Sequence, residues 1–293
     1  MSELATRLEW GLVPAVPVPF RGSELDTAAQ QRYAAWMASH SVAGVAVWAH
    51  TGRGPHLSAD QRRVVLETWR EAIPNRVLVA GARDITMAIE ARRGKADALL
   101  AFPERQDPVG YHRRLSRELP VIGFYLYEAA GGVAYDDATL EAILELPGVI
   151  GIKVATLDSV MTCQRIATLV ARYPGKLFIT GEDRFLGYSV MLGARAALIG
   201  MGAALPDLQA ELLRAAAAHE WGRFVELSAR CDRFAQATFT PPMEGYVRRM
   251  LWAAAADGGL PPESCDDPWG PELPAAERAA VEQAVRDARA ARA

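Results

Sequence analysis

Short apolar runs with strand character alternate with longer helical segments from the start of the chain to about residue 217, and few folds accommodate this alternation. Each run is followed by a helical segment of roughly ten to sixteen residues, a length that suits a connection between parallel strands. Runs that are apolar throughout are typical of strands covered on both faces, as in a parallel sheet. The eight predicted strands lie at 12–18, 42–49, 77–81, 98–101, 121–127, 149–154, 177–180 and 197–201.

Eight consecutive strand–helix units favour a closed (β/α)8 TIM barrel, an α/β fold, over an open doubly wound sheet. The open sheet stays as the alternative, because periodicity alone does not show closure. Ser58 and Gln61 have the spacing of a capping box, which predicts that a helix begins directly after Ser58.

The C-terminal part of the chain, from about residue 206, is almost wholly helical and rich in Ala and Arg. Its Pro- and Asp-rich stretch at 258–274 is typical of a linker. Additional helices packed on the barrel are expected at 222–237, 242–256 and 275–293. We therefore predict a barrel over residues 1–217 and a C-terminal helical extension over residues 218–293.

The composition excludes several classes of protein. Of the 293 residues, 51% are apolar and the net charge is −3, which excludes a disordered chain and a general attraction to nucleic acids or anionic lipids. The cysteines Cys163, Cys231 and Cys265 are odd in number and far apart, which predicts no disulfide framework and favours a reducing cytoplasm. Residues 1–10 lack the apolar stretch of a signal peptide, and no apolar run is long enough to span a bilayer. We expect a soluble, cytoplasmic protein without a membrane or nucleic-acid partner.

A lysine lies near the end of the sixth predicted strand, where barrels place their active sites. Lys153 follows the apolar run that begins at Val149. One interpretation is a side chain that snorkels to the surface or pairs with a carboxylate. The other is a nucleophilic amine: a free lysine with a pKa near ~10.4 is neutral in only about one molecule in a few thousand at pH 7, and burial raises that fraction.

Two further groups at strand ends could assist such an amine. Tyr127 ends the fifth predicted strand, and its hydroxyl could move protons, although a tyrosine there is more often a packing residue. His50, Thr51 and Gly52 follow the second strand in a tight loop whose hydroxyl and backbone N–H groups could hold a carboxylate. A plain turn is the alternative for this loop.

Taken together, these pieces resemble the dihydrodipicolinate synthase and N-acetylneuraminate lyase family of class I aldolases. The resemblance covers nearly the whole chain, and its most specific element is the Gly-Ile-Lys-x-Ala-Thr strand with a tyrosine one strand earlier. The matching segments, in the order of the family, are Ala15-Val-Pro-Val-Pro-Phe20, Thr51-Gly52, Tyr127, Gly151-Ile-Lys153-Val-Ala-Thr156 and Gly181-Glu-Asp183.

The resemblance implies a lyase that forms a Schiff base between Lys153 and pyruvate or another 2-oxo acid, and that breaks or forms a C–C bond. Tyr127 would be the acid/base, with His50 as a further catalytic residue, and an aldehyde is a possible co-substrate. The substrate would be held by Thr51, Gly52, Gly181, Asp183 and Ile199. No metal or cofactor is needed for this chemistry, and the histidines show no zinc-binding spacing. Relatives of this kind form homodimers or homotetramers, so we expect a homo-oligomer.

Several positions depart from the family pattern. His50 stands where the family usually carries a hydroxyl that relays protons to the catalytic tyrosine, and Arg53 replaces a glutamate. The loop that begins at Glu128 is shortened and lacks the arginine that binds a carboxylate in the synthase. Glu104 and Arg105 stand where the family carries a pair of tyrosines. These departures argue against dihydrodipicolinate synthase activity itself, whereas a histidine can still relay protons.

Other functions stay open on the sequence alone. A dehydratase of 2-oxo-3-deoxy sugar acids would use the same lysine and tyrosine. A non-catalytic relative could bind a 2-oxo acid for sensing or scaffolding, because a fold does not guarantee a function. Sialic acid lyase activity, a metal-dependent aldolase and a phosphate loop at Gly200 and Gly202 have weaker support.

Overall fold

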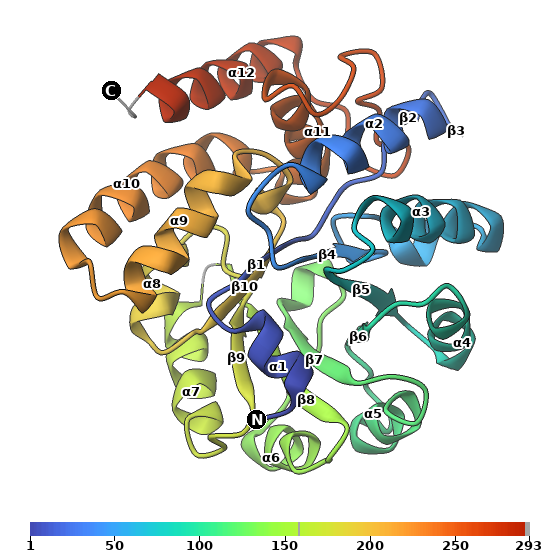
Figure 1. The fold of residues 1–293 in the computed structure, drawn as a ribbon, viewed down its shortest axis with the longest axis vertical. Helices are drawn as coiled ribbons and strands as arrows, with labels where there is room; N and C mark the ends of the chain where they lie inside the picture. Colours follow the sequence, from blue (N-terminus) through green and yellow to red (C-terminus); the bar gives the residue numbers. More distant parts are fainter. Residues whose placement is uncertain (158, 291–293) are drawn as a thin grey trace.

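Eight parallel strands form a barrel at the centre of the molecule (Figure 1). The structure is a computed structural model that describes residues 1–157 and 159–290. The order around the barrel is β1-β10-β9-β8-β7-β6-β5-β4. The strands are β1 (Leu12–Pro14), β4 (Gly44–Val47), β5 (Val77–Ala82), β6 (Ala98–Ala101), β7 (Val121–Leu126), β8 (Val149–Ala155), β9 (Leu177–Thr180) and β10 (Ala196–Ile199).

The first and last strands of this order meet, which closes the sheet. Ala15, just beyond β1, pairs in parallel with Ala46 of β4, and the Val16 N–H donates to the Ala46 carbonyl at 3.1 Å. The Ala43 N–H donates to the Leu12 carbonyl at 2.9 Å at the same seam. The predicted (β/α)8 TIM barrel is therefore confirmed, and the open-sheet alternative is wrong.

A helix follows each strand and packs on the outside of the barrel (Figure 1). The predicted start of α3 is confirmed, because Ser58 and Gln61 form both hydrogen bonds of a capping box. The helices are α2 (Thr27–Ala38), α3 (Ala59–Ala72), α4 (Ile85–Arg93), α5 (Pro108–Leu115), α6 (Asp137–Leu144), α7 (Val160–Val170), α8 (Leu186–Met191) and α9 (Pro206–Ala217).

Two predicted strands are shorter than expected by several residues. In the run at 12–18, strand β1 ends at Pro14 and the bonds to neighbouring strands continue only to the Val16 N–H, because Pro17 has no N–H to donate. The run at 42–49 ends at Val47, since Trp48 takes a left-handed backbone conformation, with φ of 55°, that turns the chain out of the sheet.

The sequence patterns missed two N-terminal elements. Helix α1 (Glu3–Leu8) lies across one end of the barrel in Figure 1 and buries Ala5 and Leu8 against the barrel interior. A short hairpin of β2 (Phe20–Arg21) and β3 (Glu24–Leu25) precedes α2.

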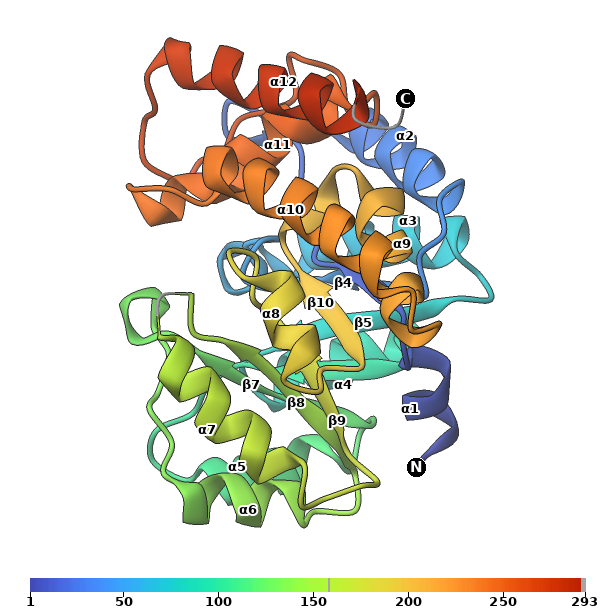
Figure 2. The same cartoon turned by 90° about the vertical axis from the view of Figure 1, so that its left-hand side faces the viewer.

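The C-terminal helices gather on one side of the barrel (Figure 2). They are α10 (Trp221–Thr238), α11 (Tyr246–Ala256) and α12 (Ala275–Ala290). The predicted helix at 242–256 begins with a separate 3-10 turn, Met243–Gly245, before α11. Of the helix predicted at 275–293, residues 291–293 lie outside the described residues. Within residues 1–157 and 159–290, no helix is long and apolar enough to cross a membrane.

Candidate active site

A pocket of about 360 Å³, including its open mouth, lies at the carboxyl ends of the barrel strands. Strands β7 to β10 and the loop after β4 supply most of its wall, and the C-terminal extension supplies two aromatic rings. The lining residues are His50, Thr51, Phe124, Leu126, Tyr127, Lys153, Ala155, Leu157, Gly181, Asp183, Gly200, Phe239 and Tyr246.

Lys153 on β8 is buried in this pocket, with 5% of its surface exposed. Its Nζ lies 4.2 Å from the centre of the Phe124 ring on the neighbouring strand. Burial lowers the lysine pKa to about 8, against the opposing charges of Asp183 and Glu182. At pH 7 about one amine in ten is then neutral. A lysine that snorkels to the surface is excluded, and the geometry suits a nucleophile.

The segment after β9 shapes the space around this lysine. A Cβ on Gly181 would lie 2.6 Å from the Lys153 Cε, so only glycine leaves room for the lysine stem. Glu182 accepts hydrogen bonds from the backbone N–H of Thr156 at 2.6 Å and of Leu157 at 3.0 Å, which fixes the chain just beyond β8. Asp183 accepts one from the Met201 N–H at 2.6 Å. Burial raises the pKa of both carboxyls to about 7.

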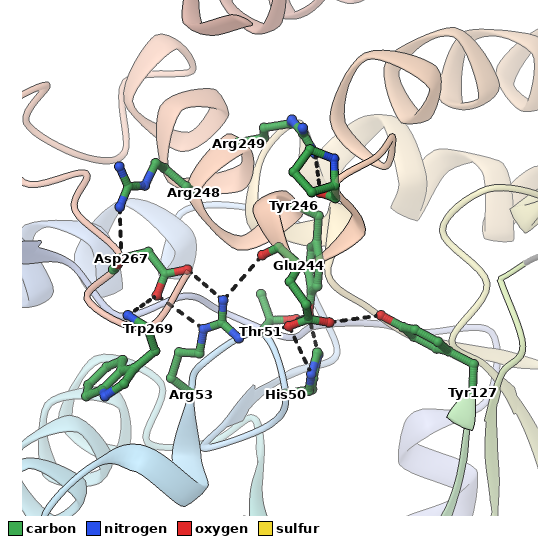
Figure 3. Close-up of polar contacts among 11 residues, drawn as sticks. His50, Thr51, Arg53, Tyr127, Glu244, Tyr246, Arg248, Arg249, Asp267 and Trp269 are labelled. Atoms are coloured by element: carbon green, nitrogen blue, oxygen red, sulfur yellow. Dashed lines mark hydrogen bonds and ion pairs between the residues drawn. The ribbon is translucent and has the colours of Figure 1, made fainter. Parts of the chain in front are cut away.

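Tyr127 follows β7 and points toward the C-terminal extension (Figure 3). Its hydroxyl donates to the Glu244 Oε1 at 3.2 Å. Burial and the adjacent Glu244 carboxylate raise the pKa of the Tyr127 hydroxyl above its usual value. The hydroxyl therefore keeps its proton at neutral pH and can donate it.

The loop after β4 meets Tyr246, the first residue of α11 (Figure 3). The Tyr246 hydroxyl lies 2.9 Å from the His50 Nδ1 and 3.1 Å from the Thr51 Oγ1. Burial lowers the pKa of His50 to about 4, so its imidazole is neutral at physiological pH. A neutral imidazole carries one N–H and one acceptor nitrogen, which lets it pass a proton from one ring nitrogen to the other.

Arg53, which stands in this loop where the resemblance would place a glutamate, does not line the pocket. Its guanidinium is buried and donates to both oxygens of Asp267, at 3.2 and 2.7 Å (Figure 3). It also donates to the Glu244 Oε2 at 3.0 Å and to the Glu244 carbonyl at 3.3 Å. Arg53 thus ties the barrel loop to the C-terminal extension.

Six of the predicted site residues line one pocket. They are Lys153, Tyr127, His50, Thr51, Gly181 and Asp183. Gly52 and Ile199 do not line it. The side of Gly52 where a Cβ would project faces the Val16 carbonyl, and Ile199 packs in the layer between strands and helices. Because side chains alternate along a strand, Ile199 faces away from the barrel interior that Leu198 joins, and Gly200, just beyond the end of β10, lines the pocket.

Sequence reasoning missed the contribution of the C-terminal extension. Phe239 and Tyr246 line the pocket, and Glu244 contacts Tyr127 beside it. Tyr246 is 196 positions from its partner His50, and no spacing rule connects residues so far apart. Within the part of the chain that the structure describes, no three His, Cys, Asp or Glu side chains gather in a way that could hold a metal ion.

Comparison with known proteins shows similarity over most of the chain. No protein-family model matches. The 4-hydroxy-tetrahydrodipicolinate synthase of Ruegeria pomeroyi is 28% identical over 250 residues, which cover 79% of this chain and 84% of that protein. The sialic acid aldolase of Ruminococcus gnavus, solved as a catalytic lysine mutant, has a TM-score of 0.84 at 18% identity and covers 98% of both chains. A prophage protein of the dihydrodipicolinic acid synthase family from E. coli K12, solved in complex with pyruvate, has a TM-score of 0.82 at 18% identity, over 95% of this chain and 98% of that one.

Proposed function

Since the chain is a divergent member of the dihydrodipicolinate synthase and N-acetylneuraminate lyase family, we propose that it is a class I aldolase-type lyase whose Lys153 forms an imine with pyruvate or a related 2-oxo acid. The observation that carries this proposal is the buried Lys153 amine, with its pKa lowered to about 8, in one pocket with Tyr127. A protein that only bound a 2-oxo acid would need neither group in this arrangement.

The proposed reaction begins when the neutral Lys153 amine adds to the C2 carbonyl of the 2-oxo acid and forms a C–N bond. The amine nitrogen gives up one of its protons, and Tyr127 donates another to the former carbonyl oxygen; with these two protons the oxygen leaves as water, so that an iminium ion remains. The iminium draws electrons from C3. When C4 carries a hydroxyl group, loss of its proton breaks the C3–C4 bond, releases an aldehyde and leaves an enamine, which takes up a proton at C3 to become an iminium ion again. The same steps in reverse form the bond. Hydrolysis of the iminium returns the free amine, so no metal or cofactor is required.

The 2-oxo acid carboxylate is proposed to bind the Thr51 hydroxyl, which the Tyr246 hydroxyl orients at 3.1 Å. Gly181 and Asp183 would contact the distal part of the substrate. Gly52 and Ile199, which do not line the pocket, are proposed to support its wall from behind.

We do not extend the proposal to dihydrodipicolinate synthase activity, although relatives carry that name. The loop after Tyr127 carries Glu128 and no arginine, so the carboxylate site that the resemblance would require there is missing. Analysis of the products would separate an aldolase from a dehydratase of 2-oxo-3-deoxy sugar acids, because both use the same imine.

Borohydride reduction in the presence of a panel of 2-oxo acids, followed by intact-mass and peptide mapping, tests the proposal. We expect a covalent adduct on Lys153 that is absent from Lys153→Ala, and the acid that is trapped most completely identifies the substrate class. Folded protein that gives no adduct with any 2-oxo acid would overturn the enzyme proposal in favour of a binding protein.

We also propose that the protein works in the cytoplasm as a homodimer or homotetramer, with an aldehyde as its second substrate. The three cysteines are free and buried, which is compatible with a reducing compartment. Light scattering that shows a monomer at micromolar concentration would contradict the assembly.

A further inference from the structure

We propose that Glu244 is the positioning residue through which Tyr127 exchanges protons with His50 and with solvent while the Lys153 imine forms and is hydrolysed. This inference rests on the proposed function and adds a residue from the C-terminal extension to it.

The two oxygens of Glu244 face different partners (Figure 3). The Oε1 accepts the Tyr127 hydroxyl at 3.2 Å. The Oε2 lies 3.0 Å from an Arg53 nitrogen and 3.5 Å from the His50 Nε2. In the described part of the chain, Glu244 is thus the group that joins the proposed acid of the site to the histidine of the loop.

Further contacts extend this connection in both directions. His50 is neutral, so its Nδ1 can accept from Tyr246 while its Nε2–H points toward Glu244, which gives the order Tyr246, His50, Glu244, Tyr127. The Glu244 side chain is 39% exposed, whereas Lys153 is buried, so Glu244 offers protons a route between the pocket and water.

Iminium formation requires such a route. Starting from the neutral amine, the overall reaction consumes one amine, one carbonyl group and one proton, and it produces one iminium ion and one water molecule. Tyr127 holds one proton, and that proton leaves with the water, so the tyrosine must be reprotonated before the next cycle. The raised pKa of Tyr127 makes a lasting tyrosinate costly, which favours a neighbour that returns the proton at once.

A role as a counter-ion for Arg53 does not account for this placement. Asp267 already binds Arg53 through both of its oxygens and is itself buried, so it balances the guanidinium charge. Glu244 adds a second carboxylate, of which one oxygen is turned away from Arg53 toward the tyrosine.

Glu244→Gln tests the proposal, because the amide keeps the shape and can still accept from Arg53 but cannot carry a proton. We expect the rate of borohydride-trapped imine formation with pyruvate to fall about 100-fold, while the dissociation constant for pyruvate and the melting temperature change little. Glu263→Gln is the matched control, since Glu263 pairs with Arg21 on the surface and should leave the rate unchanged.

A second variant separates proton transfer from structure. Glu244→Ala should also be slow, and formate should restore part of its rate where chloride at the same ionic strength does not. The role of Glu244 would be overturned, without affecting the proposed function, by either of two results. One is imine trapping by Glu244→Gln at the wild-type rate, and the other is an equal increase in the trapping rate of Glu244→Ala with chloride and with formate. Failure of the wild-type protein to trap any 2-oxo acid would instead overturn the proposed function, and this inference with it.

Discussion

At the scale of single residues, the lysine pKa sets the pH at which the proposed nucleophile becomes available. Below pH 8 most Lys153 side chains are ammonium ions, because their pKa is about 8, and the neutral fraction grows about tenfold per pH unit. We predict that the initial rate of imine trapping with pyruvate rises in this way and levels off above pH 8. Trapped adduct measured by mass from pH 6 to 10 checks this, and a rise that continues toward the ordinary lysine value of 10.5 would contradict it.

His50 gives the second prediction at this scale. The neutral imidazole lies between Tyr246 and Glu244, so its removal interrupts proton movement without removing a group that holds the substrate. His50→Ala should lower kcat about 100-fold and change KM little, the pattern of a lost transition-state interaction. Steady-state kinetics with the most readily trapped 2-oxo acid provides the measurement. A kcat equal to that of the wild type would mean that His50 is a packing residue.

The sequence could place Lys153 and Tyr127 at the carboxyl ends of neighbouring strands because this placement depends on local features, an apolar strand and a residue at its end. The partners of these residues depend on the folded chain. Tyr246 begins α11 and Glu244 lies in the 3-10 turn directly before it, but helical periodicity does not state what such a turn contacts. The pattern of β10 likewise does not state which face Ile199 takes, since one step along a strand reverses the direction of the side chain.

At the scale of elements, the contact between the loop after β4 and the linker before α12 holds the pocket together. Arg53 is 7% exposed and the Asp267 side chain 1%, so Asp267→Asn leaves a buried guanidinium with less than its full charge compensation. We predict a loss of about 3 kcal/mol in the free energy of unfolding. Urea unfolding measures it, and Glu263→Gln, at the exposed pair with Arg21, should cost at most about 1 kcal/mol. Equal losses in the two variants would mean that the buried pair is not a stabilising connection.

Element boundaries followed the sequence where the local signal was specific and departed from it elsewhere. The capping box at Ser58 predicted the start of α3, because both of its hydrogen bonds lie within four residues. The apolar run at 12–18 overstated β1, because prolines continue an apolar pattern while they remove ladder donors. Helix α1 has six residues, too few for a helical period to show.

At the scale of the whole molecule, the same strand–helix units could form a closed barrel or an open sheet. The periodicity favours the barrel but does not show that it closes. Closure depends on the pairing of Ala15 with Ala46, which are 31 positions apart at the two ends of the strand order. The same closure brings the ends of β7 and β8 to one pocket, and the C-terminal extension adds Phe239 and Tyr246 to its lining. The barrel was thus predictable from sequence, whereas the part of the pocket that the extension supplies was not.

The charges that this architecture places around the pocket limit the second substrate. Among the lining residues that the structure describes, Lys153 is the one with a cationic form at neutral pH, because His50 is neutral, and Lys153 is taken up by the 2-oxo acid in the proposed reaction. Arg53 is committed to Asp267 and Glu244. The remaining wall combines apolar side chains, among them the rings of Phe124 and Phe239, with the Asp183 carboxyl and the hydroxyl groups of Thr51, Tyr127 and Tyr246.

An aldehyde with its own carboxylate would therefore meet the Asp183 carboxyl in the pocket wall and the Glu244 carboxylate beside Tyr127, without an uncommitted cation to bind it. At a separation of about 6 Å and an effective dielectric constant of about 20, the repulsion is on the order of 3 kcal/mol before screening by salt. We predict that, in condensation with pyruvate, butanal has a kcat/KM at least about tenfold higher than succinic semialdehyde, which has the same carbon chain but ends in a carboxylate. The ratio of the kcat/KM values for butanal and succinic semialdehyde should decrease in Glu244→Gln and at high salt, because both changes weaken the repulsion. A preference for succinic semialdehyde would show that a cation in this pocket binds carboxylates, and the argument from charge would then be wrong.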